Sequence, residues 1–155
     1  MKKSAMWYVV VLLVCGLCHV VLGGQSTCAP ETLDFNGTYL FTLAYEDGFT
    51  SGGSFTIVQE GQLVDVEMNV THIADQPLSG TGSVDGDRIS FGVVDDSWPP
   101  GRTPEPTSLT FNGRGIDLNE DGMVDTVSGV FNGSECTDTC EEVVGDFDAM
   151  TDVSG

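Results

Sequence analysis

The chain has little positive charge, and that charge is unevenly placed. Its 155 residues hold 24 Asp and Glu against 5 Lys and Arg, for a net charge of −19. Both lysines, Lys2 and Lys3, lie at the N-terminus, and the rest of the chain carries only Arg88, Arg102 and Arg114. A surface this acidic repels phosphate backbones, so nucleic-acid binding is excluded as a function. The lack of lysine beyond Lys3 also excludes Schiff-base chemistry and the lysine of phosphate-binding loops.

Catalytic motifs are equally scarce. No Gly-x-Ser-x-Gly nucleophile elbow occurs, and His72 is the only histidine after the apolar N-terminal run. Triad chemistry would depend on His72, which follows an expected strand near Asp75 and is read more simply as a loop histidine in solvent. Acidic residues are so abundant that no carboxylate pair stands out as a glycosidase pair. We therefore expect a protein that is not an enzyme, with a small secreted hydrolase as the less favoured alternative.

Residues 1–24 have the layout of a secretory signal. Lys2 and Lys3 precede an apolar run over residues 6–22, and the small residues Gly23 and Gly24 follow it. The alternative is an uncleaved N-terminal anchor, since the length of the run overlaps that of short membrane spans. In both cases the acidic body is exported. We expect the protein in the extracellular space or the cell envelope, with the N-terminal segment as its main membrane contact.

The cysteines are consistent with export. Two of the five lie in the apolar run, which leaves Cys28, Cys136 and Cys140. Cys136 and Cys140 are four residues apart and predict a small disulfide loop in an oxidising compartment. With that disulfide formed, Cys28 is left over and could carry a lipid after the signal. Alternatively, Cys28 pairs with Cys136 or Cys140 and links the first strand to the last. Three cysteines and one histidine are too few for a zinc site.

After the signal, apolar residues recur at every second position, and turn residues interrupt them about every dozen residues. Each series leaves Thr, Ser, Asp, Glu or Asn on the other face, as antiparallel strands with one wet face do. The eight series are Tyr39, Phe41, Leu43 and Tyr45; Phe55 and Ile57; Val64, Val66, Met68 and Val70; Leu78, Gly80, Gly82 and Val84; Ile89, Phe91 and Val93; Leu109, Phe111 and Gly113; Val127, Gly129 and Phe131; and Val143, Gly145, Phe147 and Ala149.

Short connections join these series. Glu60-Gly61 and Asp85-Gly86 predict two-residue hairpin turns, because glycine accepts a positive φ. Residues 119–122 predict a slightly longer turn, and residues 47–53 a glycine-rich connection. Residues 95–106 hold four of the six prolines and predict the one long loop, because proline cannot join a strand ladder.

These features together predict an all-β fold of about eight antiparallel strands in an up-and-down meander. Sequential hairpins place neighbouring strands side by side, and closure into a barrel hides the sheet edges. The alternative is a β-sandwich. The predicted domain organisation is a signal peptide at 1–24, a linker at 25–35, the barrel at 36–150 and a tail at 151–155.

Several short glycine-containing motifs lie between residues 36 and 149. They are Gly37-Thr38-Tyr39, Leu78-Ser79-Gly80-Thr81-Gly82, Asp87-Arg88-Ile89-Ser90-Phe91, Val127-Ser128-Gly129-Val130-Phe131 and Gly145-Asp146-Phe147-Asp148-Ala149. These motifs resemble those of small bacterial secreted lipocalin-like barrels. The resemblance implies a closed barrel with a small hydrophobic ligand inside, although the Gly-x-Trp motif of true lipocalins is not matched.

The most specific polar motif is the stretch from residue 117 to residue 125. It alternates oxygen-bearing side chains, allows a sharp turn at Gly122, and resembles the first nine positions of an EF-hand loop. It departs from that loop at the twelfth position, where Ser128 replaces the bidentate Glu, and it is more similar to the helix-free loops of extracellular calcium proteins such as thrombospondin type 3 repeats. The alternative is a hairpin turn that favours the same residues for backbone reasons. The predicted Ca²⁺ ligands are the side chains of Asp117, Asn119, Asp121 and Asp125 and the carbonyl of Met123.

Trp98, in the proline-rich loop, is the only tryptophan left after signal removal. At a barrel mouth it would cap a small ligand or stack on a sugar. The alternative is that it folds with Pro99 and Pro100 as a hydrophobic lid.

The sequence thus predicts an exported acidic β-domain that acts as an envelope or extracellular binding or structural module, with a weak calcium site and an unidentified small ligand or envelope partner. The alternative is a lipocalin-like carrier of a small hydrophobic ligand in the barrel interior. Large aromatic residues that meet at the centre would fill that interior, whereas an open cavity of several hundred Å³ would favour carriage.

Overall fold

The structure is a computed structural model that describes residues 31–73, 77–97, 106–136 and 139–152. All regular secondary structure in these ranges is β-strand, as the period-two pattern predicts. The strands are β1 (Gly37–Tyr45), β2 (Thr50–Glu60), β3 (Leu63–Val70), β4 (Leu78–Asp85), β5 (Arg88–Val94), β6 (Ser108–Ile116), β7 (Thr126–Cys136) and β8 (Cys140–Thr151).

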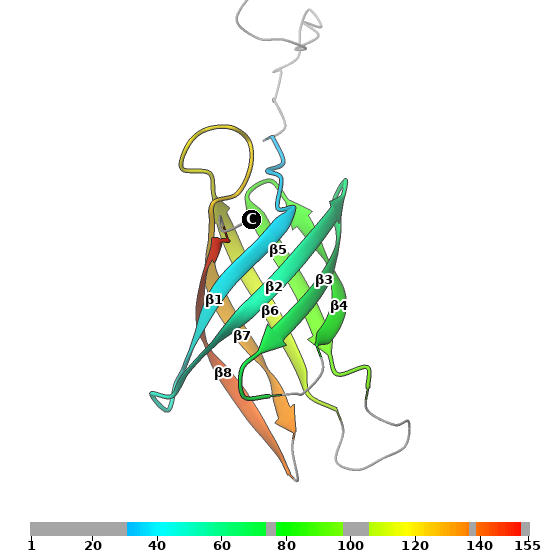
Figure 1. Cartoon of the computed structure of the whole chain (residues 1–155), viewed down its shortest axis with the longest axis vertical. Helices are drawn as coiled ribbons and strands as arrows, with labels where there is room; N and C mark the ends of the chain where they lie inside the picture. The colour runs from blue at the N-terminus through cyan, green and yellow to red at the C-terminus, as the bar shows by residue number, and fades with distance from the viewer. Residues whose placement is uncertain (1–30, 74–76, 98–105, 137–138, 153–155) are drawn as a thin grey trace, which may run out of the picture. The chain divides into compact units, whose positions relative to one another are not determined.

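The eight strands form a closed up-and-down barrel, which confirms the predicted fold class over the sandwich (Figure 1). Each strand pairs antiparallel with the next along the chain. β1 and β8 close the barrel, and Leu43 pairs there with Phe147. Closure leaves neither terminal strand with an unpaired edge, so the barrel has no strand edge open to pairing with another chain.

The predicted dry face points into the barrel. In β1, for example, Tyr39, Phe41 and Leu43 are buried, whereas the residues between them are exposed. The centre is filled with aromatic rings: the Phe111 ring centroid lies 4.9 Å from that of Phe91, 5.3 Å from that of Phe147 and 5.8 Å from that of Phe131. Burial of this apolar surface is the main force that stabilises the barrel.

The two-residue hairpins occur where they are predicted, shifted by one residue. Glu60 and Asp85 are the last residues of β2 and β4, so the turns are formed by residues 61–62 and 86–87. Gly61 and Gly86 have φ of +65° and +62°, values that favour glycine. The glycine-rich connection is shorter than predicted: β2 already starts at Thr50, because residues 50–53 pair with the end of β1.

The core also contains a residue that precedes β1. Phe35, which the sequence places in the linker, is fully buried in the core. The Tyr39 hydroxyl donates hydrogen bonds to the carbonyls of Phe35, at 3.1 Å, and Val124, at 3.3 Å. Phe35 and Val124 therefore close the barrel at the end that carries the 117–125 loop, which we call the loop end. The opposite end, with the connections after β1, β3, β5 and β7, we call the His72 end.

Candidate functional site

The predicted calcium loop connects β6 to β7 and is organised around Asp117. The Asp117 carboxylate accepts hydrogen bonds from the backbone amides of Gly122 and Glu120, both at 2.7 Å. It also accepts from the amides of Asn119, at 3.2 Å, and Asp121, at 3.3 Å. Side chains of Asp and Asn commonly stabilise turns by contacts of this kind.

The other predicted side-chain ligands make similar local contacts. The side-chain oxygen of Asn119 accepts from the Asp121 amide at 3.0 Å, and Asp121 Oδ1 accepts from the Met123 amide at 2.9 Å. Asp125 Oδ2 accepts from the amide of Leu118 at 2.6 Å and so joins the two ends of the loop. The four predicted side-chain ligands therefore all accept hydrogen bonds from backbone amides of this loop.

These amides affect the acidity of Asp117. Desolvation alone would raise the pKa of the carboxyl, but the hydrogen bonds from Gly122, Glu120, Asp121 and Asn119 outweigh it and lower the pKa below its ordinary value. The carboxylate of Asp117 is thus held in its charged form by the loop itself. In the described ranges, no three His, Cys, Asp or Glu side chains lie together in a way that would hold a metal ion with the loop in this conformation.

The His72 end contains a polar cluster that the sequence analysis did not identify. Ser51 Oγ lies 2.5 Å from His72 Nδ1, and Glu135 Oε2 lies 3.3 Å from His72 Nε2. The Tyr45 hydroxyl donates to Glu135 Oε1 and lies 3.3 Å from His72 Nε2. These four residues, which we call the His72 cluster, come from the end of β1, the start of β2, the connection after β3 and the end of β7.

The His72 cluster has the residue types of a Ser-His-Glu triad but not the surroundings of one. A hollow of about 210 Å³ lies beside His72 and Glu135, and Ser51 does not line it. A nucleophile has to face the space that holds its substrate, so this geometry does not support acyl transfer. The cluster instead joins three strands and the connection after β3 by side-chain hydrogen bonds.

Tyr45 is the donor that holds this cluster together. Burial raises the pKa of its hydroxyl, and the hydrogen bond to Glu135 and the negative charges of Glu135 and Asp47 raise it further. Tyr45 therefore stays protonated at all physiological pH values. Its ring also packs against those of Phe131 and Phe49, with centroid distances of 5.1 and 5.4 Å.

The remaining predicted site residues have different outcomes. Cys136 and Cys140 form the predicted disulfide, which links the end of β7 to the start of β8. Cys28 and Trp98 lie outside the described residues. No sequence motif marks the His72 cluster, because its hydrogen-bonded pairs are separated by 21 to 90 positions.

Comparison with known proteins found no matching family model, no matching curated protein and no matching solved structure. Within the part of the chain that the structure describes, no helix has the length and apolarity needed to cross a membrane.

Proposed function

We propose that the chain is an exported, non-enzymatic binding or structural module whose partners contact its outer surface and end loops. The observation that carries this proposal is the filled interior. The ring of Phe111 packs against those of Phe91, Phe131 and Phe147 from β5, β7 and β8, and all four side chains are buried.

The packed interior weighs against the lipocalin-like alternative. A carrier of a small hydrophobic ligand needs a cavity of about 300–1,000 Å³. In this barrel the corresponding space holds aromatic side chains, and removing one of them would leave an unfavourable void. We therefore favour ligand binding on the outside of the barrel.

We further propose that the 117–125 loop binds Ca²⁺ weakly. The loop supplies the hard oxygen ligands that Ca²⁺ prefers, and its backbone is already folded by the Asp117 contacts. Asp121 and Asp125 each use one carboxylate oxygen for an amide, so each has a second oxygen to offer. Coordination requires Asp117 to exchange some of its amide contacts for the ion. This exchange, together with the lack of a bidentate Glu, supports a dissociation constant of about 10⁻⁴ M or weaker, as in extracellular modules.

A thermal-denaturation titration tests the calcium site. With about 10 mM Ca²⁺ and a dissociation constant of about 10⁻⁴ M, the melting temperature should rise by up to about 10 °C. Asp121→Ala should abolish the rise, whereas Asp65→Ala, which removes an exposed carboxylate from β3, should preserve it. No rise in the wild-type chain, or an equal rise in Asp121→Ala, would exclude the site.

Export is tested separately by the mass of the secreted product under non-reducing conditions. A mass that corresponds to cleavage near Gly23 or Gly24 would support the signal peptide, and an intact N-terminus would support the anchor. The same spectrum reports a lipid on Cys28 and the number of free thiols.

A further inference from the structure

The two arginines that the structure describes lie opposite each other on the outer face of the barrel. Arg88 on β5 is the Cα partner of Arg114 on β6, and both side chains are exposed. Like charges that face each other across two strands destabilise a sheet. In a chain with a net charge of −19, the pairing also gathers the scarce positive charge in one place.

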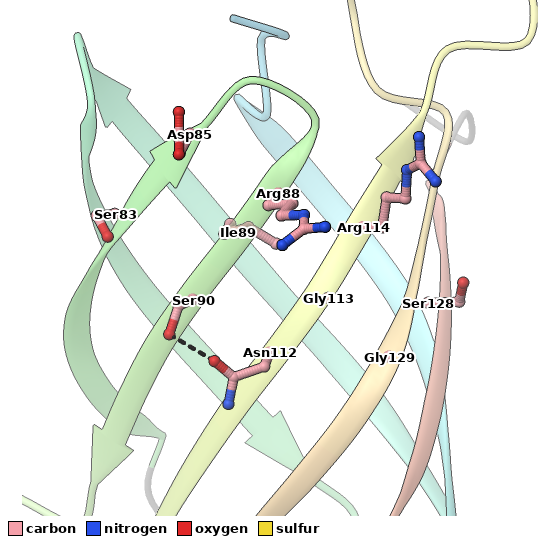
Figure 2. Close-up of a pocket in the computed structure, with 10 residues that line it drawn as sticks. All are labelled: Ser83, Asp85, Arg88, Ile89, Ser90, Asn112, Gly113, Arg114, Ser128 and Gly129. Atoms are coloured by element: carbon pink, nitrogen blue, oxygen red, sulfur yellow. Dashed lines mark hydrogen bonds between the residues drawn. The ribbon is translucent and has the colours of Figure 1, made fainter.

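Only one of these arginines has a counter-ion within the structure. Arg114 Nε lies 2.5 Å from Asp87 Oδ2. Arg88 has Asp85 as its Cα partner on β4, but its guanidinium forms no ion pair or hydrogen bond with the described residues. In Figure 2 the Arg88 guanidinium is directed toward β6, across the space between the two strands. The planar donor group of Arg88 is therefore open to an external acceptor.

Arg88 borders a hollow on the outer face of strands β4 to β7, which we call the arginine groove. It has a volume of about 480 Å³, and paired glycines, Gly113 and Gly129, form its floor. A Cβ on Gly113 would lie 2.7 Å from Phe147 Cζ, and one on Gly129 would lie 2.1 Å from the Asn112 carbonyl oxygen. Gly113 therefore lets β6 pack close to Phe147, and Gly129 lets the backbones of β6 and β7 approach each other.

Residues that line the arginine groove also carry hydrogen-bond donors. Ser90 Oγ donates to Asn112 Oδ1 at 2.9 Å, a contact drawn in Figure 2, which leaves the Asn112 amide protons for a ligand. The Ser128 hydroxyl lies on the next strand, beside Arg114 in register. Three adjacent strands therefore carry the guanidinium of Arg88, the side-chain amide of Asn112 and the hydroxyl of Ser128.

We propose that the arginine groove binds a hydroxylated monocarboxylate, with a uronic-acid sugar unit as the representative ligand. The carboxylate pairs with the Arg88 guanidinium, and ligand hydroxyls bond to Asn112 and Ser128. Asp85 and Asp87 flank the two arginines, and together with the acidic surface they disfavour ligands with more than one negative charge. This inference rests on the proposed function as an outer-surface binding module and specifies a ligand class for it.

The groove is tested by titrating sugars into the ¹⁵N-labelled secreted chain and following its backbone amide resonances. Glucuronate should shift the amides of Ser90, Gly113 and Gly129 and saturate at low-millimolar concentration, about 1–10 mM. Glucose lacks the carboxylate and acetate lacks the hydroxyls, so each should bind at least about tenfold more weakly. Inorganic phosphate, which carries more charge, should also bind more weakly than glucuronate.

Variants then assign the contact to Arg88. Arg88→Gln should weaken glucuronate binding at least about tenfold, and Arg88→Lys should give an intermediate loss because it keeps the charge but not the fork. Asp85→Asn should tighten binding about two- to threefold by removing a flanking negative charge. Glu67→Gln makes the same change in net charge on the outer face of β3, outside the groove, and should leave the affinity within about twofold.

Several results would overturn the proposal: no shifts at the groove amides, equal binding of glucose, tighter binding of phosphate, or full affinity in Arg88→Gln. If glucuronate fails to bind while Ca²⁺ still stabilises the chain through Asp121, the arginine groove is wrong and the proposed module with its calcium loop stands.

Discussion

The two ends of the barrel are held by different kinds of contacts. At the loop end, Asp117 organises its loop through amides two to five residues away in the sequence. At the His72 end, Tyr45 and Glu135 meet across 90 positions, and Ser51 and His72 across 21. The Asp117 contacts are therefore local, whereas the His72 cluster forms only when the barrel is closed.

The 117–125 loop and the His72 cluster therefore differ in how freely they can exchange contacts for a ligand. The 117–125 loop has many local amide contacts and is also tied to Asp34, so it can exchange some Asp117 contacts for an ion and keep its shape. A cluster that joins three strands and a connection is committed to holding them together and has little freedom to bind a ligand. On the proposed function, we expect binding at the loop end and the outer face, and a stabilising role for the His72 cluster.

The largest effect is expected at the loop end, from Phe35→Ala. Phe35 is fully buried beneath the loop, so its removal should lower the free energy of unfolding by about 3–5 kcal/mol in urea denaturation. Phe49→Ala is the matched variant at the His72 end, where the ring is half-exposed and the expected loss is about 1 kcal/mol. Equal losses in the two variants would show that Phe35 does not close the barrel.

The next effect concerns the disulfide at the His72 end. Replacing both Cys136 and Cys140 with serine should lower the free energy of unfolding by about 2 kcal/mol, the chain-entropy value for so short a loop. Adding a reductant to the wild-type chain should shift the urea midpoint by the same amount and leave the doubly substituted chain unchanged. A midpoint that does not respond to reductant would mean that the bridge does not form.

Tyr45→Phe should lower the free energy of unfolding by a somewhat smaller amount, about 1–2 kcal/mol, because it removes a partly buried hydrogen bond to the Glu135 carboxylate. Glu135→Gln should cost a similar amount. The double variant should lose less than the sum of the two, since both changes remove the same contact. Strictly additive losses would indicate that the two side chains do not interact in solution.

The smallest effect is the pH dependence of the loop end. The lowered pKa of Asp117 makes its contribution to stability fully present above the unfolded-state value near pH 4. The contribution is lost as the pH falls through the folded-state pKa. Below about pH 4, the melting temperature of the Asp117→Asn chain should therefore fall less steeply with decreasing pH than that of the wild-type chain. If the melting temperatures of the two chains fall in parallel over this pH range, the amides of Gly122 and Glu120 do not stabilise the charged carboxylate.

Much of the fold could be predicted because its determinants are local. Alternation along residues such as Tyr39, Phe41 and Leu43 sets which face is buried, and short turns at Gly61 and Gly86 set the antiparallel order. The burial of Phe35 could not be predicted, because a single aromatic residue before a strand belongs to no alternating pattern. Only the closed barrel places Phe35 near Val124, where the Tyr39 hydroxyl contacts both carbonyls.

The sites divide in the same way. The spacing of Asp117, Asn119 and Asp121 predicts a calcium loop or a turn from the sequence alone, and in the structure these side chains make the local amide contacts of a turn. Nothing in the sequence relates Arg88 to Arg114, because their pairing depends on the register between β5 and β6. Register is fixed by inward-facing partners such as Phe91 and Phe111, which the sequence places on the same face but not side by side.

The most direct test of outer-surface binding at the loop end is amide hydrogen exchange with and without Ca²⁺. Our account predicts slower exchange for the amides of Asn119 to Met123 when Ca²⁺ is present, with unchanged exchange around His72 and Glu135. Exchange that is unaffected in the loop, or that slows equally at both ends of the barrel, would contradict it.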